Sequence, residues 1–220
     1  MTLRVDVWSD VVCPWCYVGA AHLSAALHDF EHADDVDVVW RAFELDPNAP
    51  PEREGSYISR LARKYRVDGE GALAMVERMV TAGAAMGLDL RFDIARAGNT
   101  FDAHRLLQLA LATAGAPLQG ALKDRLFRAY FTDGLPIGDR SVLLVLAGEA
   151  GVDRDEAAAV LDSDRFAAEV RADETAAASM DVHGVPFFLV DGTYGLAGAH
   201  RPENLLRVLQ RAWAEGAQSS

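Results

Sequence analysis

Two stretches near the start of the chain alternate apolar and polar residues, as half-buried strands do. They are residues 3–8 (LRVDVW) and 36–43 (VDVVWRAF). Between them, apolar residues recur at three- and four-residue spacing, which predicts a helix from about residue 14 to 32. The N-terminal part is therefore predicted to be β-α-β, with the first strand ending just before the helix.

The pattern changes after residue 46, where a Pro-rich loop (PNAPPEREG) leads into more than 100 residues of helical texture. Apolar stripes predict successive helices at about 57–65, 73–80, 103–110, 122–131, 142–147, 156–161 and 166–179. Periodicity alone does not separate 142–147 from a buried strand, but the Ala and Glu around it favour helix. Asn99, Thr100, Asp139 and Asp153 are candidate N-caps.

The strand pattern returns in the segment GVPFFLVDG, which begins at Gly184. It predicts a strand at 187–190, a tight turn at Asp191 and Gly192, a second strand at 193–197, and a terminal helix opening at Pro202. The expected fold class is α/β, in the order β-α-β, helical block, β-β-α. We expect one domain formed by residues 1–48 and 180–220, interrupted by an inserted helical domain at 49–179.

Composition excludes several classes of function. Among 220 residues, 50% are hydrophobic, and 21 Lys plus Arg face 33 Asp plus Glu, for a net charge of −12. Without a basic run, nucleic acid is not an expected partner. The sequence shows neither a secretory signal nor the roughly 20 apolar residues of a membrane span, so we expect a cytoplasmic protein without membrane partners. The sequence predicts no particular oligomeric state.

The two cysteines, Cys13 and Cys16, form a CPWC motif at the predicted strand-to-helix junction. A disulfide this local is rarely structural in a reducing compartment, so the motif favours thiol-disulfide chemistry. Cys13 would lie at the helix N-terminus, which favours an anion, with Cys16 shielded one turn inside. We therefore expect Cys13 to be the nucleophile and Cys16 the resolving thiol. Pro14 suits the first helical turn, and with Trp15 it should tune the thiol and contact substrate.

A zinc site is the alternative for the same cysteines, because His28 and His32 follow them at nearly zinc-finger spacing. In a single helix, however, the twelve residues from Cys16 to His28 span about 18 Å, too far for these side chains to share one ion. The apolar spacing that runs through this segment favours a single helix. We therefore expect no metal at this site.

Pro186 precedes the second predicted pair of strands and has two interpretations. In the first, it is an ordinary proline at the entry to a strand. In the second, the Val185–Pro186 bond is cis and turns the backbone of Val185 toward the cysteines, where it could pair with a substrate peptide. The local sequence favours the first interpretation, since cis bonds are a small minority of X-Pro bonds.

The strings SDVVCPWCYVG and GVPFFLVDG, separated by a long helical segment, resemble the DsbA-like family of thioredoxin-fold oxidoreductases over nearly the whole chain. Within it, the stretches NTFDAHRLL, YFTDG and GLAGAH look similar to the FrnE-like branch. The resemblance implies a thioredoxin-like fold with a large all-helical insertion. It also implies that Cys13 is the reactive thiol, that Cys16 is its partner, and that Pro186 is a cis-proline facing them.

Further polar residues are weaker candidates. The resemblance implies that the helix after Asn99 lies over the cysteines, so Asn99 and His104 join Val185 as expected substrate-binding residues. His104 could equally be a surface residue or a paired interior histidine. Asp10, close to Cys13, could accept a proton or simply cap the loop.

Dithiol-disulfide exchange with protein or small-molecule thiols is the leading expectation for function, with no tightly bound cofactor and with glutathione as a candidate redox partner. The alternative is a glutathione-dependent transferase or isomerase, similar to the kappa-class transferases and the 2-hydroxychromene-2-carboxylate isomerases. A third interpretation is a non-enzymatic chaperone or interaction module.

Overall fold

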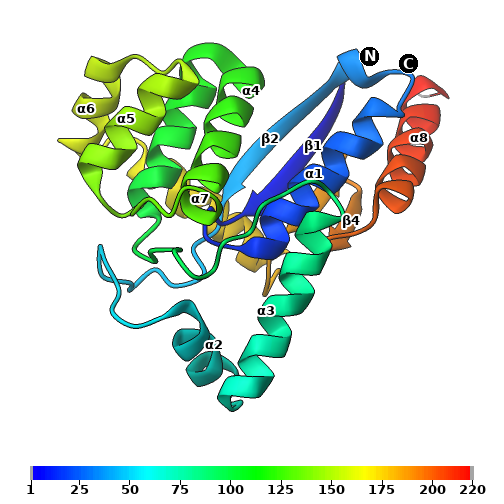
Figure 1. Ribbon diagram of the computed structural model, residues 1–220. Helices are drawn as coiled ribbons and strands as arrows, with labels where there is room; N and C mark the ends of the chain where they lie inside the picture. Colours follow the sequence, from blue (N-terminus) through cyan, green and yellow to red (C-terminus); the bar gives the residue numbers. More distant parts are fainter. Residues whose placement is uncertain (1, 219–220) are drawn as a thin grey trace.

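A four-stranded mixed sheet forms the centre of the protein in a computed structural model that describes residues 2–218 (Figure 1). The strand order is β2-β1-β3-β4; β1 pairs parallel with β2 and antiparallel with β3. The strands are β1 (Leu3–Ser9), β2 (Val36–Ala42), β3 (Phe187–Val190) and β4 (Tyr194–Ala197). Asp191 and Gly192 both have positive φ and form the expected tight turn of the β3–β4 hairpin.

Helices α1 (Pro14–His28) and α8 (Pro202–Gln218) lie side by side on one face of the sheet (Figure 1). The predicted end of the first helix, at His32, was wrong: α1 ends at His28 and a short 3-10 turn, η1 (Ala33–Asp35), leads into β2. Phe30 nevertheless stays buried, because its ring packs edge-on against Trp213 of α8 at 6.1 Å. The apolar spacing therefore predicted the burial of Phe30 correctly, but it placed the end of the helix four residues too late.

Six helices lie between β2 and β3, as the helical texture predicts. They are α2 (Tyr57–Tyr65), α3 (Gly69–Ala84), α4 (Phe101–Phe131), α5 (Arg140–Ala150), α6 (Arg154–Leu161) and α7 (Ala167–Ser179). The helices expected at 103–110 and 122–131 are the two arms of α4, which bends at Ala114 and Gly115. Asp139 and Asp153 cap α5 and α6. The domain limits at residues 48 and 180 stay a prediction.

Side chains from α4 and α7 protect the open edge of β2. The amide of Gln119 accepts from the backbone N–H of Trp40 and donates to its carbonyl, both at 2.9 Å, as a neighbouring strand would. Asp173 of α7 accepts from the backbone N–H of Ala42 and from the guanidinium of Arg41, both at 3.0 Å. These bonds satisfy backbone groups that would otherwise pair with another chain, and they fix both helices to the sheet.

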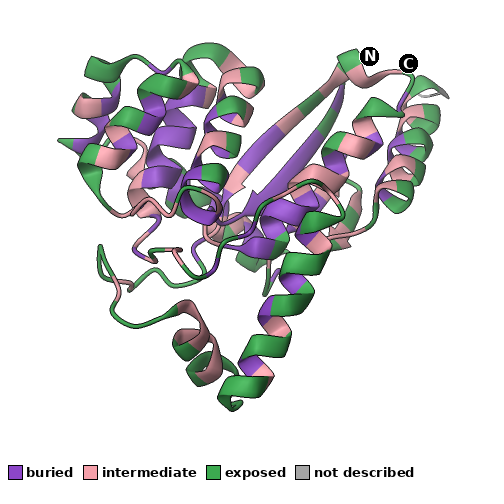
Figure 2. Ribbon diagram, in the orientation of Figure 1, coloured by how far each residue is buried: buried purple, intermediate pink, exposed green. Residues whose placement is uncertain are grey.

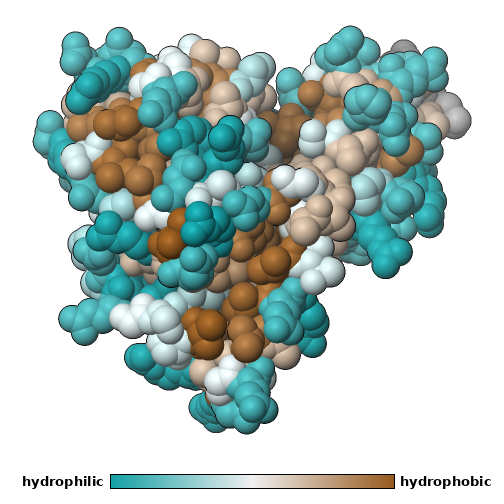
Figure 3. Space-filling view, viewed as in Figure 1, coloured by the Kyte–Doolittle hydropathy of each residue, from teal (hydrophilic) through white to brown (hydrophobic). Residues whose placement is uncertain are grey.

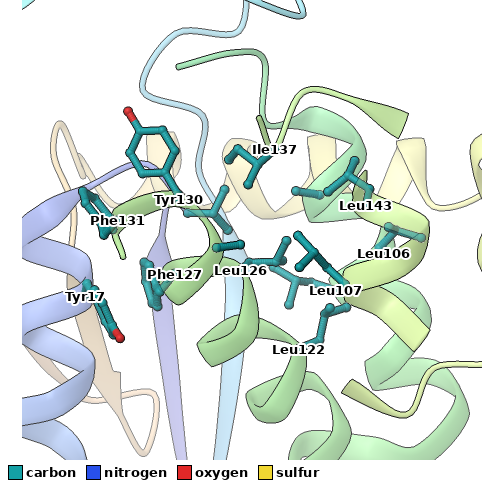
Figure 4. Packing of buried hydrophobic residues seen from close by; sticks show 14 of the residues in the cluster. Tyr17, Leu106, Leu107, Leu122, Leu126, Phe127, Tyr130, Phe131, Ile137 and Leu143 are labelled. Carbon is teal, nitrogen blue, oxygen red and sulfur yellow. The ribbon is translucent and has the colours of Figure 1, made fainter. Parts of the chain in front are cut away.

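An aromatic contact fixes α1 to the helical segment. Tyr17 stacks on Phe127 of α4, with ring centroids 4.8 Å apart, and lies beside Phe131 (Figure 4). These rings belong to the larger apolar core, which includes Cys13 and Cys16 and extends through α4 to α6 (Figure 2). Burying an aromatic side chain contributes roughly 1.5–3 kcal/mol. The turn that carries the cysteines is therefore held between the sheet and α4.

Helices α2 and α3 extend away from the body of the molecule (Figure 1). The sequence predicts a buried apolar stripe on α3; of its four residues, Val76 and Met79 are buried, whereas Leu73 and Val80 are exposed. Helix α3 packs mainly on α2 and α1, and Leu73 and Val80 lie outside these contacts as exposed side chains. Hydrophobic side chains accordingly appear on the surface at the centre of this view and down toward α2 and α3 (Figure 3). Within residues 2–218, no helix is long and apolar enough to cross a membrane.

Candidate active site

Cys13 occupies the N-cap of α1, where the chain leaves the loop after β1. Its φ and ψ of −91° and 114° are extended, and its carbonyl accepts from the backbone N–H groups of Cys16 and Tyr17 at 3.1 and 3.2 Å. Pro14 is buried in the first turn, where a missing N–H costs nothing. The first amide groups of the helix thus gather around Cys13, an arrangement that stabilises negative charge.

The two cysteines are 3.2 Å apart and have different surroundings. Cys13 is 5% exposed, whereas Cys16 is completely buried. Burial raises the pKa of the Cys16 thiol well above its ordinary value, and the hydrogen bond and charge of Cys13 raise it further; the charge of Lys123 and contact with Ser9 oppose this. The Cys16 thiol therefore resists ionisation, as expected of a resolving thiol that reacts only after Cys13 has attacked a substrate.

The Val185–Pro186 peptide bond is cis, as the resemblance implies. The carbonyl oxygen of Val185 accepts a hydrogen bond from the Cys13 thiol, with 3.6 Å between sulfur and oxygen. Pro186 is buried against α1, close enough that a Cβ added to Gly19 would lie 3.0 Å from its Cγ. The loop before β3, which contains Val185 and Pro186, thus faces Cys13. The catalytic role of Pro186 stays a prediction.

A hollow of about 460 Å³ adjoins this loop. Most of its wall comes from the loop before β3 and from the end of β4; the lining residues are Met180, Asp181, Val182, His183, Gly184, Val185, Phe187, Ala197 and Gly198. Trp15, next to Cys13 in the chain, is 41% exposed. Apolar surface is thus available on the hollow's wall and at Trp15, Pro14 is buried, and the assignment of Pro14, Trp15 and Val185 to substrate binding stays a prediction.

His104 lies beneath the site. It is 2% exposed, with Nε2 3.5 Å from Oδ1 of the buried Asp10. The structure therefore shows a buried interior histidine beside Asp10 and not a surface one, and its assignment to substrate binding stays a prediction. Burial raises the pKa of Asp10, but the proximity and charge of His104, with the Leu45 amide and Lys123, together hold it below its ordinary value.

Lys123 of α4 is a residue that the sequence analysis missed. It is fully buried, and Nζ donates to the carbonyl oxygen of Ser9 at 3.2 Å. Burial lowers the pKa of Lys123 to about 8, although the negative charges of Cys16, Asp10 and Cys13 oppose the shift. One signal was available: position 123 falls on the same helical stripe as Leu122, Leu126 and Phe127, so a lysine there faces the interior.

Of the two predicted cap residues, Thr100 occupies the N-cap position of α4 without a side-chain cap bond, and the side chain of Asn99, one residue earlier, bonds the first helical N–H instead. Its Oδ1 accepts from the backbone N–H of Phe101 at 2.8 Å, and its Nδ2 donates to the carbonyl of Ala49 at 3.2 Å. It also lines a shallow hollow of about 220 Å³ together with Pro51 and Gly138. The contacts of Asn99 therefore explain its place in the fold, and its assignment to substrate binding stays a prediction.

The histidines of the zinc alternative lie away from the cysteines. The side chain of His28 is 87% exposed at the end of α1, whereas Cys16 is buried in its first turn. His32 instead stacks on Trp213, with ring centroids 4.2 Å apart. Across residues 2–218, no cluster of three or more His, Cys, Asp or Glu side chains could hold a metal ion.

Three solved structures are similar to this fold along nearly its whole length. A probable DsbA oxidoreductase from Streptomyces coelicolor is 41% identical, with a TM-score of 0.90, 97% of this chain and 91% of that one being covered. The cytosolic disulfide reductase DsbM from Pseudomonas aeruginosa, in a structure with GSH, is 19% identical, with a TM-score of 0.68 and coverages of 96% and 99%. A 2-hydroxychromene-2-carboxylate isomerase is 18% identical, with a TM-score of 0.65 and both coverages at 99%.

The two more distant structures show the fold alone, whereas the sequence match identifies the family. Residues 4–210, which include both cysteines and the cis-proline, match the family described as DSBA-like thioredoxin domain. The 41% identity to the Streptomyces protein supports the same assignment. The chain therefore belongs to the DSBA-like thioredoxin family.

Proposed function

We propose that this protein is a dithiol-disulfide oxidoreductase in which Cys13 is the nucleophile and Cys16 the resolving thiol. One observation carries the proposal. Cys13 lies at a helix N-terminus facing the carbonyl of Val185, and the buried Cys16 lies 3.2 Å behind it. A disulfide-exchange site needs this pairing of a reactive sulfur with a second sulfur within reach.

The reaction has two exchange steps. The Cys13 thiolate attacks one sulfur of a substrate disulfide, releasing the other sulfur as a thiolate and forming a mixed disulfide. Cys16 then attacks the sulfur of Cys13, which releases the second substrate thiolate and leaves the Cys13–Cys16 disulfide. Two electrons pass from the cysteine pair to the substrate, and the reverse sequence oxidises a dithiol. Backbone groups of Val185, beside Cys13, are positioned to pair with an extended substrate peptide.

Protein and small-molecule thiols or disulfides are the proposed substrates, with glutathione as the redox partner and the cytoplasm as the compartment. The proposals of glutathione as partner and of the cytoplasm as compartment draw support from the shared fold of the cytosolic disulfide reductase DsbM, which was solved with GSH. The apolar hollow beside Val185 offers space for groups next to the reacting sulfur. Equilibration with glutathione buffers, read out as the fraction of oxidised Cys13–Cys16, would test this partner and give the reduction potential.

Insulin reduction by the wild type, Cys13→Ser and Cys16→Ser tests the main proposal. We expect Cys13→Ser to lose activity and Cys16→Ser to accumulate a covalent mixed disulfide that a thiol reductant releases, visible by mass spectrometry. Full activity of Cys13→Ser would overturn the proposal. Oxidative refolding of a scrambled disulfide protein would show whether the same site also isomerises.

A glutathione-dependent isomerase or transferase is the second candidate, because the chain shares its fold with a 2-hydroxychromene-2-carboxylate isomerase over 99% of each chain. Cys16→Ser separates the two functions, since it removes the resolving step of disulfide exchange but leaves the hollow beside Val185 in place. Saturable glutathione binding by this variant, together with isomerase or conjugation turnover, would favour the second candidate. If Cys16→Ser bound glutathione but showed neither isomerase nor conjugation turnover, glutathione would be a redox partner only.

A further inference from the structure

Lys123 is a buried cation in largely aromatic surroundings. Among the described residues, Nζ of Lys123 makes one hydrogen bond, to the Ser9 carbonyl, and the ring centroids of Trp40 and Phe127 lie 5.5 and 5.0 Å from it. An ammonium group has three N–H donors, and burying it without full pairing is strongly unfavourable. A position of this kind points to a role that uses the charge or the proton of the amine.

The amine belongs to the cysteine site. The amine donates to the carbonyl oxygen of Ser9, at the end of β1 and four residues before Cys13, and Lys123 and Cys16 are both fully buried. The charge that most favours protonation of Lys123 is that of Cys16, and the positive charge of Lys123 in turn favours the Cys16 thiolate. Each group thus favours the charged form of the other, and neither has solvent-exposed surface.

The choice of residue type fits proton transfer. Lysine is rare in this chain: of the 21 Lys plus Arg residues, only Lys64 and Lys123 are lysines. Arginine keeps its proton in proteins, whereas a buried lysine can lose one near neutral pH. One of the two lysines is thus buried beside the loop that leads to Cys13, where a group that can accept and return a proton would assist the exchange steps.

We propose that Lys123 is the proton partner of Cys16, and that its amine takes up the proton that the Cys16 thiol loses on attacking Cys13. The step rests on the proposed function. The sulfur of Cys16 bonds to the sulfur of Cys13, the bond from Cys13 to the substrate sulfur breaks, and the departing thiolate takes a proton from solvent. The proton of Cys16 remains on Lys123 and returns when the disulfide is reduced again.

Other charged groups near Lys123 could share this role and are compared with it. Cys13 and Cys16 face it from α1, Asp10 from the loop after β1, and Asp124 from its own helix. Asp10 also faces His104. Because the pKa of Asp10 is held below its ordinary value, this carboxylate stays ionised near neutral pH and is a poor proton acceptor.

A coloured aromatic disulfide, DTNB, separates the two exchange steps in one experiment. The attack of Cys13 releases the first coloured thiolate, and the attack of Cys16 releases the second. For Lys123→Met we expect the first phase to stay within about threefold of the wild type and the second to slow by about tenfold or more at pH 7.5, since a pKa difference of one unit changes the ionised fraction tenfold. Lys64→Met removes the same charge from the exposed face of α2 and should change neither phase.

The pH dependence provides a readout that a purely structural role would not move. In the wild type the rate of the second phase should rise with pH and level off with a midpoint near pH 8, where Lys123 changes protonation. In Lys123→Met, and in Lys123→Gln as a second variant, the midpoint should move up by about one unit or more, because the ionisation of Cys16 alone then controls the rate.

The outcomes distinguish failure of the proposed dithiol-disulfide exchange from failure of the proton role of Lys123. If the wild type shows no first phase, or if Cys16→Ser still releases two coloured thiolates, the proposed function fails and this inference fails with it. A normal first phase with an unchanged second phase in both Lys123 variants, or equal slowing of both phases, overturns the inference alone. Should both variants fail to fold, a wild-type second phase that keeps rising tenfold per pH unit up to pH 9.5 overturns it as well.

Discussion

The sulfur of Cys13 lies 3.6 Å from the carbonyl oxygen of Val185, a residue 172 positions away in the chain. The site is therefore assembled from both ends of the protein. Helix α4, which lies between them in the sequence, supplies Lys123 and His104 from below. Because three distant segments meet here, the properties of the two sulfurs depend on contacts that the CPWC motif alone does not specify.

The unequal burial of the two thiols predicts unequal reactivity. In the reduced protein, iodoacetamide should modify Cys13 about a hundredfold faster than Cys16, because a raised pKa leaves little Cys16 thiolate and its sulfur has no exposed surface. Timed quenching and peptide mass spectrometry would give both rates, and unfolded protein serves as the control in which they converge. Similar rates in the folded protein would contradict the assignment of Cys16 as the shielded thiol.

Gly19 is predicted to be essential for the position of the Val185–Pro186 loop. In Gly19→Ala the new Cβ would lie 3.0 Å from the Cγ of Pro186 and 3.2 Å from the Cζ of Phe188. Overpacking of this kind costs about 1–3 kcal/mol, more than the roughly 1 kcal/mol that alanine gains over glycine in a helix. We expect lower stability in urea unfolding and slower disulfide exchange.

Gly148→Ala is the matched control, because the same substitution in α5 places the Cβ in open space. Here the gain in helix propensity is unopposed, so the free energy of unfolding should rise by up to about 1 kcal/mol and exchange should be unchanged. If Gly19→Ala behaved like Gly148→Ala, the close contact between α1 and Pro186 would not constrain the site.

Local patterns predicted most of the fold because strands and helices bury their apolar residues at different periods. The strands, the two arms of α4 and the hairpin at Asp191 lie where those periods indicate. The errors have a common cause, since a pattern reports apolar residues but not what covers them. Phe30 extends the period of α1 although it packs from a turn, and Leu73 is exposed although it lies on the same helical stripe as the buried Val76 and Met79.

The active site was only partly predictable for a similar reason. Cys13 and Cys16 are recognisable because their chemistry depends on spacing within one turn, and the position of Pro186 followed from a family resemblance. Lys123 and the pairing of Asp10 with His104 depend on tertiary packing of α4 against the loop after β1. A lysine or histidine on a helix is usually solvated, so only its place on the apolar stripe distinguishes a buried one.

The buried pair of Asp10 and His104 predicts a pH-dependent contribution to stability. Asp10→Asn keeps the shape and the contact with the Leu45 N–H but removes the charge that faces His104 and Lys123. We expect a loss of about 2 kcal/mol at pH 7, the scale of a hydrogen bond to a charged group. Since the folded pKa lies below the unfolded one, the contribution of Asp10 is complete above about pH 4 and disappears as pH falls through the folded value.

Urea unfolding of the wild type and Asp10→Asn at pH 7 and pH 3 would test this. The difference between the two proteins should be clear at pH 7 and should narrow at pH 3. Asp37→Asn, on the exposed part of β2, is the control and should stay within about 0.5 kcal/mol of the wild type. A constant difference at both pH values would mean that the charge of Asp10 is not what stabilises the fold.

Lys123→Met should stabilise the protein while impairing the resolving step. Burial lowers the pKa of Lys123 from 10.5 to about 8, which corresponds to roughly 3 kcal/mol against the charged form. The lost bond to the Ser9 carbonyl costs about 1 kcal/mol, so a net gain of about 2 kcal/mol is expected at pH 7.

The pH dependence of that gain has a definite sign. Between about pH 8 and 10.5 the unfolded chain holds more protons on Lys123 than the folded chain, so the wild type recovers stability as pH rises through this window. The advantage of Lys123→Met should therefore be largest below pH 8 and smaller at pH 9.5 in urea unfolding. A variant less stable than the wild type at pH 7 would make Lys123 a structural residue. A more stable variant with a slow second exchange step would instead mean that the lysine is kept for the chemistry of Cys16, at the expense of stability.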